Sequence, residues 1–175
     1  MNDSKRYPMK ETDASFYDTA PIRFDNQVDI PVAAKTLWKI LEDDHSWTVW
    51  AGVIDRVEWT SPRPFGLGTT RTVTMAKGAM TGWEQFIAWE PGQRMGFCFT
   101  EATMDGIDRF AEDWHVNAIS ASSCQVRWIM CMEPRGISKY LMPLSKPLMN
   151  WNFRRYLKNL SRYAQKEKSN PKFSG

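Results

Sequence analysis

The chain has 175 residues, of which 42% are hydrophobic and 25% are charged, and its net charge is +3 at pH 7. This composition is typical of one globular domain that can bury a core, and it excludes a wholly disordered chain. No stretch approaches 18 consecutive apolar residues, which excludes a membrane-spanning helix, and the positive charge is too weak to predict a nucleic-acid partner.

Both ends of the chain are predicted to be flexible, as an arm over residues 1–20 and a tail over residues 169–175. The arm is polar, shows no sustained hydrophobic period and lacks the apolar segment of a secretory signal peptide. The cysteines Cys98, Cys124 and Cys131 lack Cys-x-x-Cys spacing and are expected to be reduced core residues. We therefore expect a cytoplasmic protein with a single folded domain over residues 21–168.

The folded part begins with a strand and two short helices. Apolar and polar side chains alternate from Phe24 to Ile30, the period of a strand with one buried face, and Pro31 ends this strand. The apolar residues of the two helices, which Asp43-Asp44 separates, are Leu37, Trp38, Ile40, Leu41, Trp47 and Trp50. This unusual order favours a hollow protein with an apolar interior.

Six further strands follow without intervening helices. They are predicted at residues 53–60, 69–75, 81–89, 95–100, 110–119 and 124–133, with turn signals between several of them. Hairpin spacing between short alternating strands predicts one antiparallel sheet. Gly66-x-Gly68 is not a phosphate-binding loop, because a strand follows it where such a loop needs a helix.

The chain ends with a predicted helix over residues 145–166, with Ser145 as its N-cap and Pro147 in its first turn. Its length of roughly 33 Å is enough to cross the sheet. Apolar residues recur at helical spacing at Met149, Phe153, Tyr156, Leu157, Leu160 and Ala164, and cations at Arg155, Lys158, Arg162 and Lys166 lie on the other side. We interpret the cations as a solvated face; the alternative is contact with phosphate or anionic lipid.

Short segments in a fixed order link these elements to a known family. They are Ile30-Pro31, Thr36 to Leu41, Trp47-x-x-Trp50-x-Gly52-Val53, Gly66-x-Gly68-Thr69, Trp89 to Gly92 with Arg94, Val126-x-Trp128, Glu133-Pro134 and Leu157 to Leu160. With this order the chain resembles the polyketide cyclase/dehydrase branch of the START and Bet v 1-like superfamily. We therefore predict an α+β helix-grip fold, in which a curved antiparallel sheet of about seven strands wraps around a long C-terminal helix and two short helices follow the first strand.

The resemblance implies a deep apolar cavity between the sheet and the last helix, which holds lipids, polyketides or other hydrophobic molecules. It implies no particular reaction, because one fold hosts many activities. Our hypothesis is binding of a hydrophobic, lipid- or polyketide-like small molecule without a cofactor and without stable membrane insertion. The alternatives are an enzyme of the cyclase or dehydratase type and an interaction module with a filled interior. The chain departs from the family in its longer arm and in its Pro-containing segment 142–148.

The two histidines, His45 and His115, give little indication of catalysis. No metal-ligand spacing accompanies them, so we expect no metal site, and His45 is predicted to flank a helix. Placing Trp114 and Trp128 on the inner face of the sheet puts His115 with Asp113 and Arg127 on the outer face. That register requires a bulge or a three-residue loop between the last two strands, and we favour it over one with His115 inside.

Three charged residues are predicted to point into the interior. The strand phases place Arg71, Glu84 and Glu112 on inner faces, where an isolated charge is unfavourable unless it is paired or neutralised. These residues could orient a polar group of a ligand or supply an acid or base. The alternative is that they are solvent-exposed at the cavity rim.

The apolar candidates for the cavity wall are large aromatic and thioether side chains, which either line a pocket or fill it. They are Trp59, Met75, Phe97, Phe99, Trp114, Trp128, Met130, Met149, Phe153 and Tyr156. With Arg71, Glu84 and Glu112 they form the predicted ligand cavity.

Overall fold

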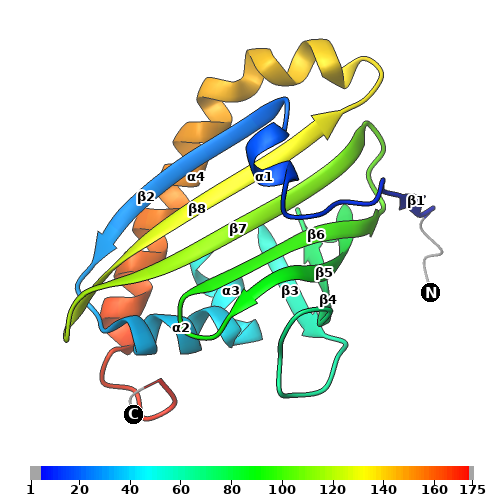
Figure 1. Ribbon diagram of the computed structural model, residues 1–175. Helices are drawn as coiled ribbons and strands as arrows, with labels where there is room; N and C mark the ends of the chain where they lie inside the picture. The colour runs from blue at the N-terminus through cyan, green and yellow to red at the C-terminus, as the bar shows by residue number, and fades with distance from the viewer. Residues whose placement is uncertain (1–4, 174–175) are drawn as a thin grey trace.

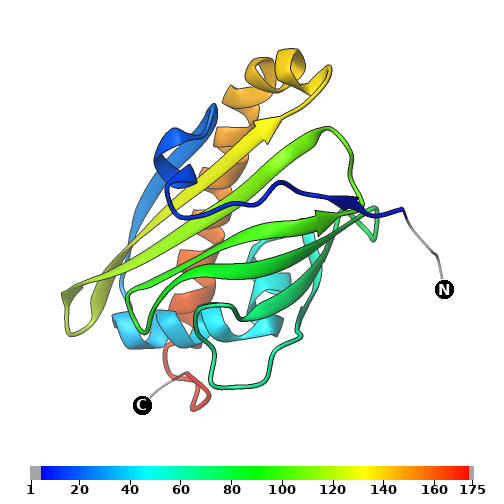
Figure 2. The same cartoon turned by 45° about the vertical axis from the view of Figure 1, so that its right-hand side comes forward.

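A curved antiparallel sheet forms one layer of the protein, and α2, α3 and α4 lie on its concave side, as Figures 1 and 2 show for residues 5–173, which the computed structural model describes. The strands run in the order β2-β8-β7-β6-β5-β4-β3, and β1 pairs with β6. The elements are β1 (Tyr7–Pro8), α1 (Phe16–Thr19), β2 (Ile22–Ile30), α2 (Ala34–Glu42), α3 (Asp44–Trp50), β3 (Ile54–Trp59), β4 (Thr70–Met75), β5 (Met80–Glu90), β6 (Arg94–Ala102), β7 (Ile107–Ser120), β8 (Ser123–Pro134) and α4 (Ser138–Glu167). The predicted helix-grip fold is confirmed.

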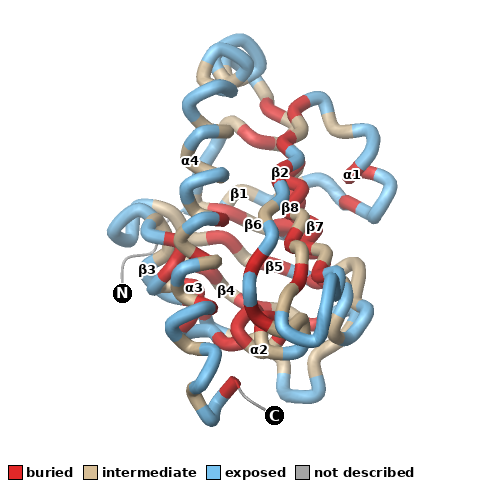
Figure 3. Tube along the Cα trace, turned by 90° about the vertical axis from the view of Figure 1, so that its left-hand side faces the viewer, coloured by how far each residue is buried: buried red, intermediate tan, exposed pale blue. Residues whose placement is uncertain are grey.

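The helices α2 and α3 close one end of the concave side. Asp43 separates them and caps α3, because its carboxylate accepts hydrogen bonds from the Ser46 backbone N–H at 3.0 Å and from the Ser46 hydroxyl at 2.7 Å. This cap directs Trp47 and Trp50 toward the sheet, where their rings lie 5.4 and 5.8 Å from that of Trp114. The buried residues therefore gather between these helices and the inner face of the strands (Figure 3).

The last helix, α4, begins seven residues before the predicted start, since it runs from Ser138 to Glu167. The prediction of Ser145 as N-cap was wrong, because Pro143 and Pro147 both lie inside the helix. The Ser145 hydroxyl donates to the Met142 carbonyl at 2.9 Å and so satisfies an acceptor within this proline-containing stretch. Packing of Met142 and Met149 against the core offsets the helix-breaking preference of the two prolines.

Residues 5–20 and 169–173, which belong to the predicted arm and tail, pack against the domain in the structure. Within residues 5–20, β1 extends the sheet and α1 buries Phe16 and Tyr17 on the convex side, against Ile129 and Cys131. In the tail, Phe173 is buried and Lys172 forms an ion pair with the α3 cap Asp43. Residues 1–4 and 174–175 of the predicted arm and tail lie outside the described residues.

The register of the last two strands confirms the predicted faces. Trp114 pairs with Trp128 and His115 with Arg127, and an irregularity between Ala118 and Ser120 supplies the bulge that this register requires. Across residues 5–173 no helix combines the length and the apolar character needed to span a membrane.

Candidate functional site

A cavity of about 420 Å³ lies between the inner face of the sheet and helices α3 and α4. Eight of the ten methionines of the chain line it, namely Met9, Met75, Met80, Met104, Met130, Met132, Met142 and Met149. The aromatic residues of the wall are Trp47, Trp50, Phe97, Phe99, Phe110, Trp128, Phe153 and Tyr156. Thioether side chains repack at little cost, so this wall can adapt to apolar molecules of different shape.

Most of the residues predicted from strand and helix phase meet at this cavity. The wall contains Arg71, Met75, Glu84, Phe97, Phe99, Glu112, Trp128, Met130, Met149, Phe153 and Tyr156. Two predicted residues do not line it. Trp59 stacks on Phe65, with ring centroids 4.0 Å apart, and Trp114 stacks on Trp128 at 4.7 Å. Trp114 faces inward as predicted, but the rings of α3 cover it.

Sequence reasoning missed the part of the wall that comes from α3, from the β6–β7 connection and from the start of α4. Trp47 and Trp50 were predicted as apolar residues of a short helix. That they face the cavity depends on how the capped helix α3 sits against the sheet, which the sequence pattern does not give. Met104 lies in a connection and Met142 lies before the predicted start of the last helix, so neither belongs to a periodic pattern. The one available signal was the excess of methionine in the composition.

Arg71 is the buried cation of the cavity wall. It lies on β4 opposite Glu84 on β5, and its guanidinium forms an ion pair with the Glu84 carboxylate. The rings of Trp47 and Phe97 each lie 4.5 Å from the guanidinium carbon, which adds cation–π stabilisation. The Nη1 atom of Arg71 is buried and has no hydrogen-bond partner among residues 5–173. This nitrogen is a free donor at the cavity wall.

Glu112 is the second polar group of the wall. Its Oε2 atom accepts hydrogen bonds from the indole N–H groups of Trp114 and Trp128, both at 2.9 Å. Burial, assisted by the nearby charge of Glu84, raises the pKa of Glu112 to about 8. Burial also raises the pKa of Glu84, and the Arg71 charge offsets this only in part. At neutral pH Glu112 is therefore a carboxylic acid that can donate a proton into the cavity.

The polar cluster around His115 lies on the convex side and does not line the cavity. Asp113 accepts two hydrogen bonds from Arg94, both at 2.9 Å, and contacts the His115 Nε2 atom at 2.9 Å. Burial works to raise the pKa of Asp113, but the hydrogen bonds from His115 and Arg94 outweigh it and hold the pKa below the ordinary value. These contacts hold the side chains of the cluster together on the outer face of the sheet. His115 therefore lies on the outer face, as predicted.

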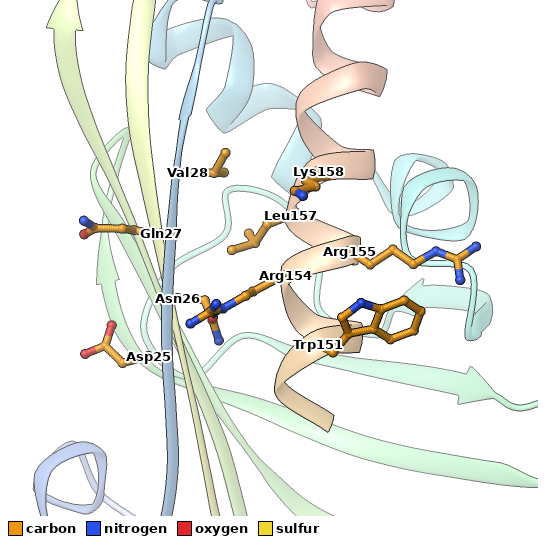
Figure 4. A pocket seen from close by; sticks show the side chains of 9 residues that line it. All are labelled: Asp25, Asn26, Gln27, Val28, Trp151, Arg154, Arg155, Leu157 and Lys158. Atoms are coloured by element: carbon orange, nitrogen blue, oxygen red, sulfur yellow. Dashed lines mark hydrogen bonds between the residues drawn. The ribbon is translucent and has the colours of Figure 1, made fainter. Parts of the chain in front are cut away.

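A larger hollow of about 760 Å³ lies outside the cavity, between β2 and α4 (Figure 4). Arg154 spans it and donates from Nε to the Asn26 side-chain oxygen at 3.0 Å, whereas Trp151 and Arg155 point away from β2. Polar and apolar groups line this hollow in equal measure, whereas the wall of the inner cavity is almost wholly apolar, so the inner cavity is the better candidate for a hydrophobic ligand. Among residues 5–173 no three His, Cys, Asp or Glu side chains are grouped to hold a metal ion.

Comparisons with known proteins agree with this geometry. Residues 21–165 match the family model described as polyketide cyclase/dehydrase and lipid transport. The uncharacterized protein Rv2574 of Mycobacterium tuberculosis is 43% identical over 158 residues, which cover 90% of this chain and 93% of the relative.

Two solved structures share the fold at low sequence identity. A START superfamily protein from Mycobacterium smegmatis has a TM-score of 0.68 at 11% identity, covering 82% of this chain and 97% of that one. The Zhui aromatase/cyclase from Streptomyces sp. R1128 has a TM-score of 0.68 at 12% identity, covering 83% of this chain and 94% of that one. Because the family model covers residues 21–165, the chain belongs to the polyketide cyclase/dehydrase and lipid transport family.

Proposed function

We propose that the protein binds a hydrophobic small molecule, lipid- or polyketide-like, in its central cavity. The observation that carries this proposal is the cavity of about 420 Å³ with its wall of methionine and aromatic side chains. Cavities for small ligands have volumes of roughly 300–1,000 Å³ and combine apolar walls with a few polar groups. The family to which the chain belongs includes lipid transport in its description, which supports the same function. A cytoplasmic location remains our prediction.

The polar groups of the wall favour a ligand with an acceptor oxygen among otherwise apolar atoms. The free Nη1 of Arg71 and the neutral carboxyl of Glu112 are both donors, and both line the same cavity. A carbonyl or phenolic oxygen would satisfy the Arg71 donor, which is otherwise buried without a partner. The expected ligand is therefore not a pure hydrocarbon but a ketone, a phenol or a related oxygenated ring compound.

The second candidate is a cyclase or dehydratase acting on such a ligand. The observation in its favour is the pKa of Glu112, which lies near neutral pH and therefore suits a general acid. In this scheme the Arg71 guanidinium holds an oxygen of the ligand, and Glu112 donates its proton to a hydroxyl that leaves as water. The Glu112 carboxylate so formed takes up the proton lost from the adjacent carbon as the carbon–carbon double bond forms, which restores the acid. Turnover that is lost in Glu112→Gln while ligand affinity is kept would select this candidate over simple binding.

Replacing Phe153 with Trp tests whether the interior is hollow. Phe153 lines the cavity and contacts the rings of Phe24 and Trp128 at 4.9 and 5.2 Å. In an empty cavity the larger ring enters free space, so an apolar fluorescent probe should bind about tenfold more weakly while the melting temperature changes little. In a filled core the same change would destabilise the protein by about 1–3 kcal/mol.

The matched control is Leu148→Trp, which adds an indole on the same helix at a position that is 63% exposed. It should change neither probe affinity nor melting temperature. Failure of the unmodified protein to bind the probe, together with a marked loss of stability in Phe153→Trp, would contradict the proposed function.

A further inference from the structure

The first half of α4, together with the N-cap residue Ile137, carries a row of large apolar side chains on its outer side. The residues are Ile137, Tyr140, Leu141, Leu144, Leu148 and Trp151, and their exposed fractions range from 56% to 78%. The described part of the chain has ten exposed large hydrophobic residues, and six of them lie in these fifteen positions. Figure 3 shows this part of the helix as mainly exposed. A concentration of this kind on one segment indicates a contact surface.

These six residues form one stripe. Their spacing of three, four, seven, eleven and fourteen residues from Ile137 confines them to an arc of about 100° at 3.6 residues per turn. Met142 and Met149, from the same segment, point to the other side and line the cavity. The segment is thus apolar on two sides, of which only one is covered within residues 5–173. We name the six residues the outer stripe.

The charged residues that the segment itself carries around the outer stripe have a single sign, although Arg135 at its start is paired with Asp105 and Asp108. Between Glu133 and Glu167 the sequence has no acidic residue, and its cations are Arg135, Lys139, Lys146, Arg154, Arg155, Lys158, Arg162 and Lys166. Four of these continue the line of the outer stripe toward the C-terminus at helical spacing, namely Arg155, Lys158, Arg162 and Lys166. The Arg155 guanidinium lies 5.8 Å from the ring of Trp151, which joins the apolar and the basic parts of the surface. A purely solvated face accounts for the four cations but leaves the outer stripe unexplained.

We propose that this face of α4 docks on the surface of an anionic lipid bilayer. Aliphatic side chains with Trp and Tyr beside Lys and Arg are the composition that lies in a membrane interface, with the rings at headgroup level and the cations on anionic lipids. A second copy of the chain fits less well, because the basic α4 segments of two copies would repel each other. Nucleic acid also fits less well, because contact with charged phosphates would not bury the six apolar side chains of the outer stripe.

Docking in this orientation has a consequence for the cavity. The wall residues Met142 and Met149 lie on the same helical segment as the outer stripe, so this wall rests on the bilayer when the stripe is inserted. The helix lies along the surface and does not cross the membrane. The docking site stands on exposure and charge alone and does not depend on whether the cavity holds a ligand.

Co-sedimentation of the full chain with lipid vesicles tests the proposal. We expect binding to phosphatidylcholine vesicles that contain about one-third phosphatidylserine, and at least tenfold weaker binding to phosphatidylcholine alone. The triple variant Leu144→Ser, Leu148→Ser, Trp151→Ser should bind the anionic vesicles at least tenfold more weakly. Replacing Arg155, Lys158, Arg162 and Lys166 with Gln should abolish the preference for anionic vesicles.

The matched control removes three exposed apolar residues elsewhere, as Val49→Ser, Leu67→Ser and Ile119→Ser, with exposed fractions of 52%, 74% and 55%. It should bind vesicles like the unmodified protein. All variants change exposed side chains, so they should melt normally and keep the apolar probe in the cavity. Equal losses in the test and control triples, no vesicle binding by the unmodified chain, or a dimer that the test triple dissociates would each overturn the proposal.

Discussion

Replacing Arg71 with Met is expected to destabilise the protein by about 3–5 kcal/mol at pH 7. The change removes the partner of Glu84, which is buried and only 4% exposed. It also removes the cation that four aromatic rings surround. Because burial already raises the pKa of Glu84, the unpaired carboxyl takes up a proton as the pH falls, and the loss should be smaller at pH 5 than at pH 7.

A double-mutant cycle separates the ion pair from simple packing. The variant Arg71→Met, Glu84→Met replaces both charges with apolar side chains, and its stability should return to within about 1 kcal/mol of the unmodified protein. The control pair Arg127–Asp25 joins two strands on the outer face and is partly exposed, so Arg127→Met should cost less than about 1 kcal/mol. Urea unfolding measures the two single variants of the cycle, the double variant and the control. Additive losses in the Arg71–Glu84 cycle would show that the two charges do not act as a pair.

The strands could be predicted well from the sequence because alternation fixes both their position and their phase. Phe24 to Ile30 identified β2, and opposing Trp114 with Trp128 fixed the register of β7 and β8. The same phase placed Arg71, Glu84 and Glu112 inside. The structure adds the partners that offset the cost of burying these charged groups. Arg71 and Glu84 form an ion pair, and Glu112 accepts hydrogen bonds from two indole N–H groups.

Helix ends were harder to predict because capping rules describe helices without tertiary packing. Ser145 as N-cap and Pro147 in the first turn predicted that the helix starts at Ser145, whereas packing of Met142 and Met149 accompanies a helix that begins at Ser138. The shorter helix hid the outer stripe, since four of its six residues precede Ser145. The helix α1 was missed for a related reason: its four residues are too few to show a period, although Phe16 and Tyr17 are buried.

Replacing Glu112 with Gln is expected to make the protein more stable at alkaline pH and to flatten the dependence of its stability on pH. The pKa of Glu112 is about 8 in the folded protein against an ordinary value of 4.5. Between these values the folded protein keeps a proton that the unfolded chain releases, so the free energy of unfolding falls as the pH rises. At about 1.4 kcal/mol for each pKa unit, this fall reaches at most about 5 kcal/mol by pH 8.

The amide that Glu112→Gln introduces keeps a carbonyl oxygen for the indole donors of Trp114 and Trp128 but cannot ionise. We therefore expect equal stability near pH 4 and a gain of roughly 2–4 kcal/mol over the unmodified protein at pH 8.

The next residue along β7 gives a control of opposite sign. Asp113 has a lowered pKa, so its contribution is present above its ordinary value of 3.8 and is lost as the pH falls through the lowered pKa. Asp113→Asn should therefore destabilise at pH 7 and match the unmodified protein in strong acid. Urea unfolding from pH 2 to 9 distinguishes these cases. Parallel curves for Glu112→Gln and the unmodified protein would show that Glu112 is already ionised at neutral pH, and would remove it as the proton donor of the cavity.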